Sequence, residues 1–277
     1  MRPNLSTSIK ARKSLGQNFL NNPDVVRDIL LAADLAVPPP KGGTTADTVL
    51  EVGPGEGVLT QALLDAGANI IAVEKDSRLI APLKQKFPAA HIIEGDILSL
   101  DISSLFANCK LQISSFKIVA NIPYYITGQF LRKIFGEENL PKRIVLMLQK
   151  EVAERIVGGN PTSLKLRGAR ESLLSISVKA YGTPSIVRYV PRENFEPVPD
   201  VDSAVLLIEN ISRDFFSAKG GPASGWNEQK FFALLRKGFE GKRKQIGKKL
   251  GMLGDTRRAE ELSLTDWKDL SLQLNTG

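Results

Sequence analysis

Short apolar runs alternate with segments of helical periodicity along most of the chain. In residues 58–66, for example, Leu59, Ala62 and Leu63 recur at the spacing of one helix face. Such alternation is typical of βαβ units, which build a parallel sheet covered by helices. Strands are predicted at residues 48–53, 69–73, 91–96, 117–120, 143–149, 173–181 and 201–208. The pattern therefore predicts an α/β, Rossmann-like fold with a seven-stranded sheet.

The pattern changes near the C-terminus. Residues 217–225 are rich in Gly, Ala and Ser, which is typical of a linker. Beyond them the apolar residues, such as Phe231, Leu235 and Leu270, fit helices alone. We expect a catalytic domain over residues 1–212 and a small all-helical domain over residues 226–277.

The small domain carries a dense group of basic residues. It comprises Lys242, Arg243, Lys244, Lys248 and Lys249. A solvated helix face is the simpler interpretation, but like charges at this density repel one another, which favours contact with phosphates. The chain as a whole has a formal charge of +7 and a pI near 9.4. A polyanionic partner such as RNA is therefore expected.

Composition excludes several kinds of site. The chain has one cysteine, Cys109, and one histidine, His91, so it can form neither an internal disulfide nor a cysteine–histidine zinc site. No metal is predicted. No stretch has the apolar length of a membrane-spanning helix. Residues 1–14 form a basic arm without the apolar core of a secretory signal.

A glycine-rich turn follows the first predicted strand of the sheet. Gly53 and Gly55 lie between a strand and a helix, which lets the backbone approach a nucleotide closely. Glu74 ends the next strand, where an acid can accept both hydroxyls of a ribose. Asp96 follows the third strand and can accept from an adenine N6, or it can cap a helix. The acidic Glu56 inside the turn disfavours a pyrophosphate, so S-adenosyl-L-methionine is the predicted cofactor.

A second motif, Asn121-Ile122-Pro123-Tyr124, ends the fourth strand. The Asn121 side-chain oxygen and the Ile122 carbonyl can each accept an N–H from a planar amino group. Pro123 fixes its own φ and holds the preceding residue extended, so that this carbonyl is aimed. Tyr124 can stack on the ring. An ordinary strand-to-turn transition is the alternative interpretation.

A loop pinned by prolines carries Phe195 near the end of the predicted sheet. Residues 192–200 contain two prolines, Pro197 and Pro199, and we expect them to display the Phe195 ring. With Tyr124, this ring could hold a flipped base from two sides. The alternative is that Phe195 covers the edge of the core.

Five motifs in order resemble those of one enzyme family. They are residues 13–20, the turn at 51–57, the motif at 121–124, residues 149–155 and residues 195–205. Together they resemble the small-subunit ribosomal RNA adenine N6,N6-dimethyltransferases of the KsgA/RsmA type. The resemblance implies a class I methyltransferase fold and dimethylation of two adjacent adenines near the 3′ end of small-subunit rRNA. It also implies a cytoplasmic, monomeric enzyme that binds pre-30S particles.

The resemblance assigns roles to individual residues. It implies cofactor contacts at Asn18, Leu20, Gly53, Glu74, Asp96 and Asn121. It implies contacts with the target base at Asn121, Ile122, Tyr124 and Phe195.

Three alternatives stay open at this point. A resistance-type methylase of large-subunit rRNA also uses Asn-Ile-Pro-Tyr, although the basic run at 241–245 resembles the housekeeping branch. A non-catalytic RNA-binding relative would not need the intact Asn121 and Glu74. A DNA adenine methylase would carry Asp-Pro-Pro-Tyr, which is absent from the chain.

Overall fold

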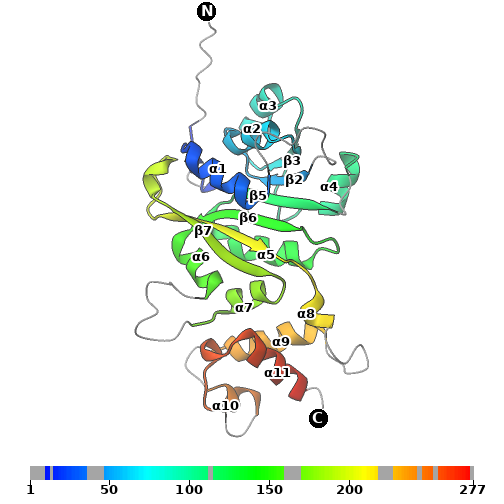
Figure 1. Cartoon of the computed structure of the whole chain (residues 1–277), viewed down its shortest axis with the longest axis vertical. Helices are drawn as coiled ribbons and strands as arrows, with labels where there is room; N and C mark the ends of the chain where they lie inside the picture. The colour runs from blue at the N-terminus through cyan, green and yellow to red at the C-terminus, as the bar shows by residue number, and fades with distance from the viewer. Residues whose placement is uncertain are drawn as a thin grey trace, which may run out of the picture. The chain divides into compact units, whose positions relative to one another are not determined.

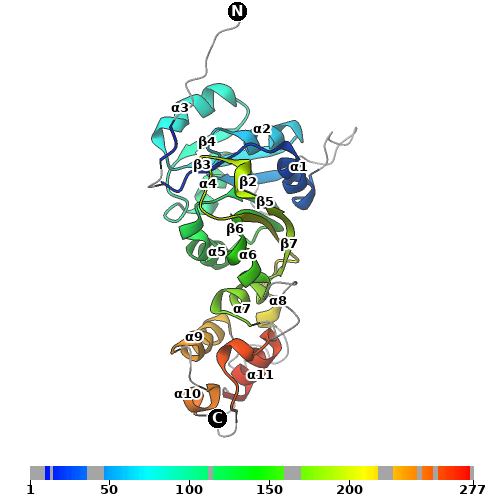
Figure 2. The ribbon, with the colours of Figure 1, turned by 90° about the vertical axis from the view of Figure 1, so that its left-hand side faces the viewer.

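The computed structural model describes residues 10–12, 15–35, 47–111, 115–158, 170–217, 227–241, 245–251 and 255–274. The chain divides into two compact units. The first is made of residues 1–150 and 187–207, and the second of residues 151–186 and 208–277. Figure 1 and Figure 2 show the ribbon of each unit from two directions.

A seven-stranded sheet has the strand order β4-β3-β2-β5-β6-β9-β7. The strands are β2 (Thr48–Val52), β3 (Asn69–Glu74), β4 (His91–Glu94), β5 (Phe116–Asn121), β6 (Arg143–Gln149), β7 (Thr183–Val190) and β9 (Ser203–Glu209). The strands from β4 to β6 are parallel, so their carboxyl ends meet at one edge. Because β2 pairs with both β3 and β5, the strand order reverses between them, which is where α/β sheets bind ligands.

Helices of the first unit connect these strands. They are α1 (Pro23–Ala32), α2 (Val58–Asp65), α3 (Ser77–Lys86), α4 (Ile102–Asn108) and α5 (Thr127–Gly136). Buried residues of the first three, including Ile29, Leu63 and Leu83, share one core with Ile70 and Val119 of the sheet. The helix that the apolar spacing predicts at residues 58–66 is thereby confirmed within one residue.

The N-terminal part of the chain adds a short pair of strands beside the large sheet. β1 (Phe19–Leu20) pairs antiparallel with β8 (Phe195–Glu196), so that Leu20 lies opposite Phe195. We call residues 15–20 the strap. The β1–β8 pairing ties the strap to the segment that leads into β9.

The second unit is mainly helical. Its helices are α6 (Lys150–Val157), which begins at the last residue of the first unit, α7 (Leu173–Lys179), α8 (Asp214–Ser217), α9 (Glu228–Phe239), α10 (Ile246–Leu250) and α11 (Leu264–Leu274). Phe231, Leu235 and Trp267 are fully buried in its core. The Trp267 ring leaves no space for a larger residue at Gly238, because an added Cβ there would lie 2.1 Å from it. The apolar spacing at the C-terminus therefore builds a helical core, as predicted.

One predicted strand is wrong. Residues 173–181 were expected to be extended because Leu174, Ile176 and Val178 alternate with polar residues. They form α7 instead, since Ser172 and Ser175 make a reciprocal capping box at its start and Ile176 and Ala180 occupy one buried face. The sixth strand of the sheet in chain order is β7, which the apolar pattern did not predict.

The division into units also differs from the predicted domains, in residues 208–212 and in the longer stretch 151–186. Ile176 and Ala180 of this stretch share a core with Phe231 and Trp267, so these residues belong with the C-terminal helices. Within the described ranges, the chain has no helix that is long and apolar enough to cross a membrane.

Candidate functional site

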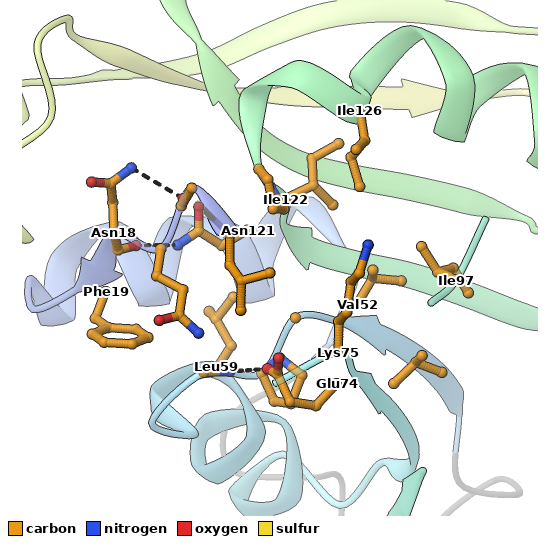
Figure 3. A pocket seen from close by; sticks show the side chains of 18 of the residues that line it. Asn18, Phe19, Val52, Leu59, Glu74, Lys75, Ile97, Asn121, Ile122 and Ile126 are labelled. Carbon is orange, nitrogen blue, oxygen red and sulfur yellow. Dashed lines mark hydrogen bonds between the residues drawn. The ribbon is translucent and has the colours of Figure 1, made fainter. Parts of the chain in front are cut away.

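A pocket opens at the carboxyl ends of β2, β3 and β5, within the first unit (Figure 3). Three kinds of segment line it: the glycine turn after β2, the strand ends that carry Glu74 and Asp96, and the residues from Asn121 to Ile126. The strap forms a further wall. Nearly every residue predicted to bind the cofactor or the target base therefore lies around one cavity, and Phe195 is the exception.

The tight turn after β2 uses backbone conformations that favour glycine. Gly53 and Gly55 have φ of 69° and 58°, in the left-handed region that favours glycine. A Cβ on Gly55 would lie 2.8 Å from the Phe19 ring of the strap. The second glycine is thus required both for the turn and for the close approach of the strap.

Glu74 is held by backbone donors at the end of β3. Its Oε2 accepts from the Gly55 N–H at 3.1 Å and its Oε1 from the Asp76 N–H at 2.8 Å. The side chain is buried, and burial raises the pKa of Glu74 while these two amides oppose the rise. Each carboxylate oxygen keeps a second lone pair for a ribose hydroxyl.

Asp96 caps the turn that follows β4 and also lines the pocket. Its Oδ1 accepts from the Leu98 N–H at 3.0 Å, which caps the following turn. Its Oδ2 lies 2.8 Å from Nζ of Lys75, and this hydrogen bond lowers the pKa of Asp96. Both residues line the pocket, so the carboxylate is ionised and available to an adenine amine.

Asn121 is oriented by the strap. Its Nδ2 donates to the backbone carbonyl of Asn18 at 2.9 Å (Figure 3). Because the amide nitrogen is engaged on that side, the Oδ1 atom is left to accept from a ligand. Ile122 has a buried side chain, and Pro123 has φ −54° and ψ 132°. Asn121, Ile122 and Pro123 all line the pocket.

Tyr124 lies half-buried in a 3₁₀ turn, η2 (Tyr124–Ile126), and lines the pocket. Its hydroxyl makes a 2.7 Å hydrogen bond with Oγ of Ser203, the first residue of β9. Burial raises the pKa of Tyr124, and the bond to Ser203 opposes this rise. The neighbouring Tyr125 is 62% exposed at the pocket wall.

The expectation that the 192–200 loop displays Phe195 is wrong. Phe195 is 1% exposed, belongs to the core of the first unit and is absent from the pocket lining. The backbone pairing of β8 with β1 turns its ring into that core beside Leu20. The proline loop thus covers the edge of the core, which was the alternative interpretation.

The strap is anchored by Asp76, a residue that no sequence motif singled out. Asp76 has a fully buried carboxylate that accepts from Nε2 of Gln17 at 2.9 Å and from the Arg78 guanidinium. The Arg78 hydrogen bonds, together with the Gln17 bond, hold the pKa of Asp76 well below its usual range. The only feature of the sequence that could have pointed to Asp76 is its position two residues after Glu74.

The predicted RNA-binding residues are described only in part. Lys248 is exposed on α10. Lys242, Arg243 and Lys244 lie outside the described residues, and so does the side chain of Lys249. No group of His, Cys, Asp or Glu that could hold a metal occurs in the described part of the chain.

The chemistry of the pocket fits an adenosine that carries no phosphate. Acidic acceptors at Glu74 and Asp96 match a ribose and an adenine amine, and Glu56 on the glycine turn disfavours an anion. With the switch point at β2, these features define an S-adenosylmethionine-dependent methyltransferase.

Comparisons with known proteins narrow this class. The family described as "Ribosomal RNA adenine dimethylase" matches residues 8–270. A Dehalococcoides mccartyi protein named "Ribosomal RNA small subunit methyltransferase A" is 37% identical over an alignment of 285 positions, which covers 96% of this chain and 89% of that protein. The chain belongs to the ribosomal RNA adenine dimethylase family.

Two solved structures share the fold. A dimethyladenosine transferase from Plasmodium falciparum has a TM-score of 0.68 at 26% identity, covering 92% of this chain and 96% of its own. The 23S rRNA methyltransferase ErmE has a TM-score of 0.67 at 22% identity, covering 93% and 99%. The second likeness concerns the fold alone.

Proposed function

We propose that this protein transfers methyl groups to N6 of two adjacent adenines near the 3′ end of small-subunit rRNA. The observation that carries this proposal is the orientation of Asn121, whose Nδ2 is engaged by the Asn18 carbonyl so that Oδ1 is left for an incoming amine. The name of the Dehalococcoides mccartyi relative supports the small subunit as the target.

The two acceptors solve the chemical difficulty of the reaction. The N6 lone pair of adenine is delocalised into the ring and is a weak nucleophile. Hydrogen bonds from both N6 protons to Asn121 Oδ1 and the Ile122 carbonyl favour a more tetrahedral nitrogen with a localised lone pair. S-adenosylmethionine, when bound, supplies an electrophilic methyl group. The protein positions the reacting groups and needs no strong base.

Glu74 and Asp96 would hold the cofactor through its ribose and its adenine. Asn18, Leu20, Gly53 and Gly55 would shape the rest of that subsite, since all of them line the pocket. The target adenine must leave its stack to reach the pocket, and Tyr124 offers it an aromatic face. For Phe195 we propose a structural role, which is to hold β1 and the strap in place.

RNA contact outside the pocket is assigned to the second unit. Lys242, Arg243, Lys244, Lys248 and Lys249 would contact rRNA phosphates in a pre-30S particle, and residues 226–277 would act as the RNA-binding domain. We further propose a cytoplasmic enzyme that acts as a monomer. The +7 formal charge of the chain supports an RNA partner.

The test is direct. Purified protein is incubated with labelled S-adenosylmethionine and with undermethylated small or large ribosomal subunits, and the modified adenines are mapped. Label in two adjacent adenines of the small-subunit rRNA supports the proposal. Label in a single large-subunit adenine would assign the chain to the resistance-type activity instead.

A further inference from the structure

We propose that Ser203 is a positioning residue, which fixes the ring of Tyr124 in the orientation that stacks on the target adenine. This inference rests on the proposed function and deepens it. It also explains how the motif at residues 195–205 serves the active site, since Phe195 does not reach the pocket.

The contact is a single short hydrogen bond to a rigid partner. Oη of Tyr124 and Oγ of Ser203 are 2.7 Å apart. Ser203 has no exposed surface and begins β9, which lies between β6 and β7 in the sheet. Its neighbour Asp202 accepts the Lys150 N–H at 3.0 Å, directly after β6. The hydroxyl of Ser203 is therefore attached to backbone that the sheet holds in place.

Tyr124 needs such a partner because it lies in a short turn. Its carbonyl accepts from Oγ1 of Thr127 at 3.1 Å, which steadies the backbone but leaves the ring free to rotate about its side-chain bonds. The next residue in the turn, Tyr125, is 62% exposed. The bond to Ser203 adds a directional restraint on the half-buried Tyr124 ring at the wall of the pocket.

The restraint matters because stacking uses the face of the ring. A ring that is ordered before the base arrives loses less rotational freedom on binding, so more of the stacking energy remains. The phenol stays neutral at physiological pH, since burial raises the pKa of Tyr124. It can therefore donate to Ser203 throughout the reaction.

The test is a double-mutant cycle in single-turnover methylation of saturating undermethylated small subunits. Ser203→Ala should slow methyl transfer about three- to tenfold, the range expected from one neutral hydrogen bond. In a Tyr124→Phe background Ser203→Ala should have almost no effect, because the Tyr124 hydroxyl that Ser203 binds is already absent. Affinity for S-adenosylmethionine should be unchanged in all three variants.

An equal loss from Ser203→Ala in both backgrounds would overturn the proposal and make Ser203 a purely structural residue. The proposal would also be overturned if Ser203→Ala methylated small subunits at the rate of the parent.

If the parent does not methylate small subunits, the proposed function fails, and a second readout still tests the contact between Ser203 and Tyr124. The chain has four tyrosines. With 3-fluorotyrosine incorporated, Ser203→Ala should shift the ¹⁹F signal that Tyr124→Phe removes. If that signal does not move, Ser203 does not position the ring.

Discussion

The backbone N–H of Gly55 donates to Oε2 of Glu74 across 3.1 Å, and so connects the glycine turn to the end of the neighbouring strand. The other carboxylate oxygen accepts from the Asp76 N–H at 2.8 Å. Each of the two carboxylate oxygens of Glu74 therefore accepts a hydrogen bond from a backbone N–H. The pocket is formed in part before any ligand enters it.

This arrangement predicts that Glu74→Gln is nearly as harmful as Glu74→Ala. A glutamine amide must place its NH₂ group against one of the two backbone donors, since only one of its two terminal atoms accepts. Each lost hydrogen bond to a charged acceptor costs about 1.5–3 kcal/mol. Calorimetry should show both variants losing most of their affinity for S-adenosylmethionine, while RNA binding is retained. Parent-like affinity in Glu74→Gln would contradict the role assigned to Glu74.

Glu51 offers a matched comparison one strand away. Its Oε2 accepts from the Thr60 hydroxyl at 2.7 Å, and among the described residues its Oε1 has no hydrogen-bond partner. Complete burial raises the pKa of Glu51 to about 8; the Thr60 bond opposes this rise and the Glu74 charge adds to it. The carboxyl is therefore mostly protonated at neutral pH, and a glutamine can replace it.

The raised pKa makes stability depend on pH in a defined direction. Between the ordinary value of 4.5 and about 8 the folded state binds the proton more tightly than the unfolded state, so stability falls as pH rises through this range. Glu51→Gln removes this contribution. Thermal melts should show the Tm of the variant rising relative to the parent between pH 5 and pH 9. A constant Tm difference would mean that Glu51 is ionised in the folded protein.

Phe195 and Tyr124 should respond to truncation in different ways. Phe195→Ala opens a cavity in the core and should lower the free energy of unfolding by about 3–5 kcal/mol, whereas Phe195→Leu should cost much less and keep methyl transfer. Tyr124→Ala should slow methyl transfer about 5- to 150-fold through lost stacking, with cofactor affinity retained. Chemical denaturation and single-turnover assays separate the two effects. Strong loss of activity in a stably folded Phe195→Leu variant would restore a direct role for Phe195.

Much of the site was predictable because parallel strands bring their carboxyl ends together. Once Glu74, Asp96 and Asn121 were placed after consecutive strands, their meeting at one edge followed from the βαβ topology. The glycine-rich turn between β2 and α2 followed from the glycine spacing in the same way. These inferences need only local sequence and the rules of sheet assembly.

Other features depend on contacts distant in sequence. Alternation in residues 173–181 fits a strand as well as a helix, and the outcome was decided by the Ser172 cap and by packing against Phe231. The direction of the Phe195 ring depends on the pairing of β8 with β1, about 175 residues earlier in the chain. The anchoring of Gln17 by Asp76 likewise has no local signature.

The basic residues of the second unit predict a dependence on salt. Replacing Lys242, Arg243 and Lys244 with Ala should weaken binding to small subunits and lower the slope of log affinity against log salt by roughly 0.7–0.9 for each lost phosphate contact. Lys84 and Lys110 are exposed lysines of the first unit. As a control, replacing both with Ala should leave the salt slope close to that of the parent. Filter binding over a series of salt concentrations measures the affinity and the salt slope of each variant. If the triple variant keeps the slope of the parent, this basic group is only solvated.

In the proposed mechanism, Asn121 accepts a hydrogen bond from the amine that is methylated. The most direct measurement is mass spectrometry of rRNA from undermethylated small subunits, after incubation with S-adenosylmethionine and either the parent or Asn121→Ala. The parent should produce N6,N6-dimethyladenosine at two adjacent positions. Asn121→Ala should still bind RNA and, with reduced affinity, the cofactor, yet leave both adenines unmodified on the same time scale when the cofactor is saturating. Dimethylation by Asn121→Ala at the rate of the parent would contradict the account.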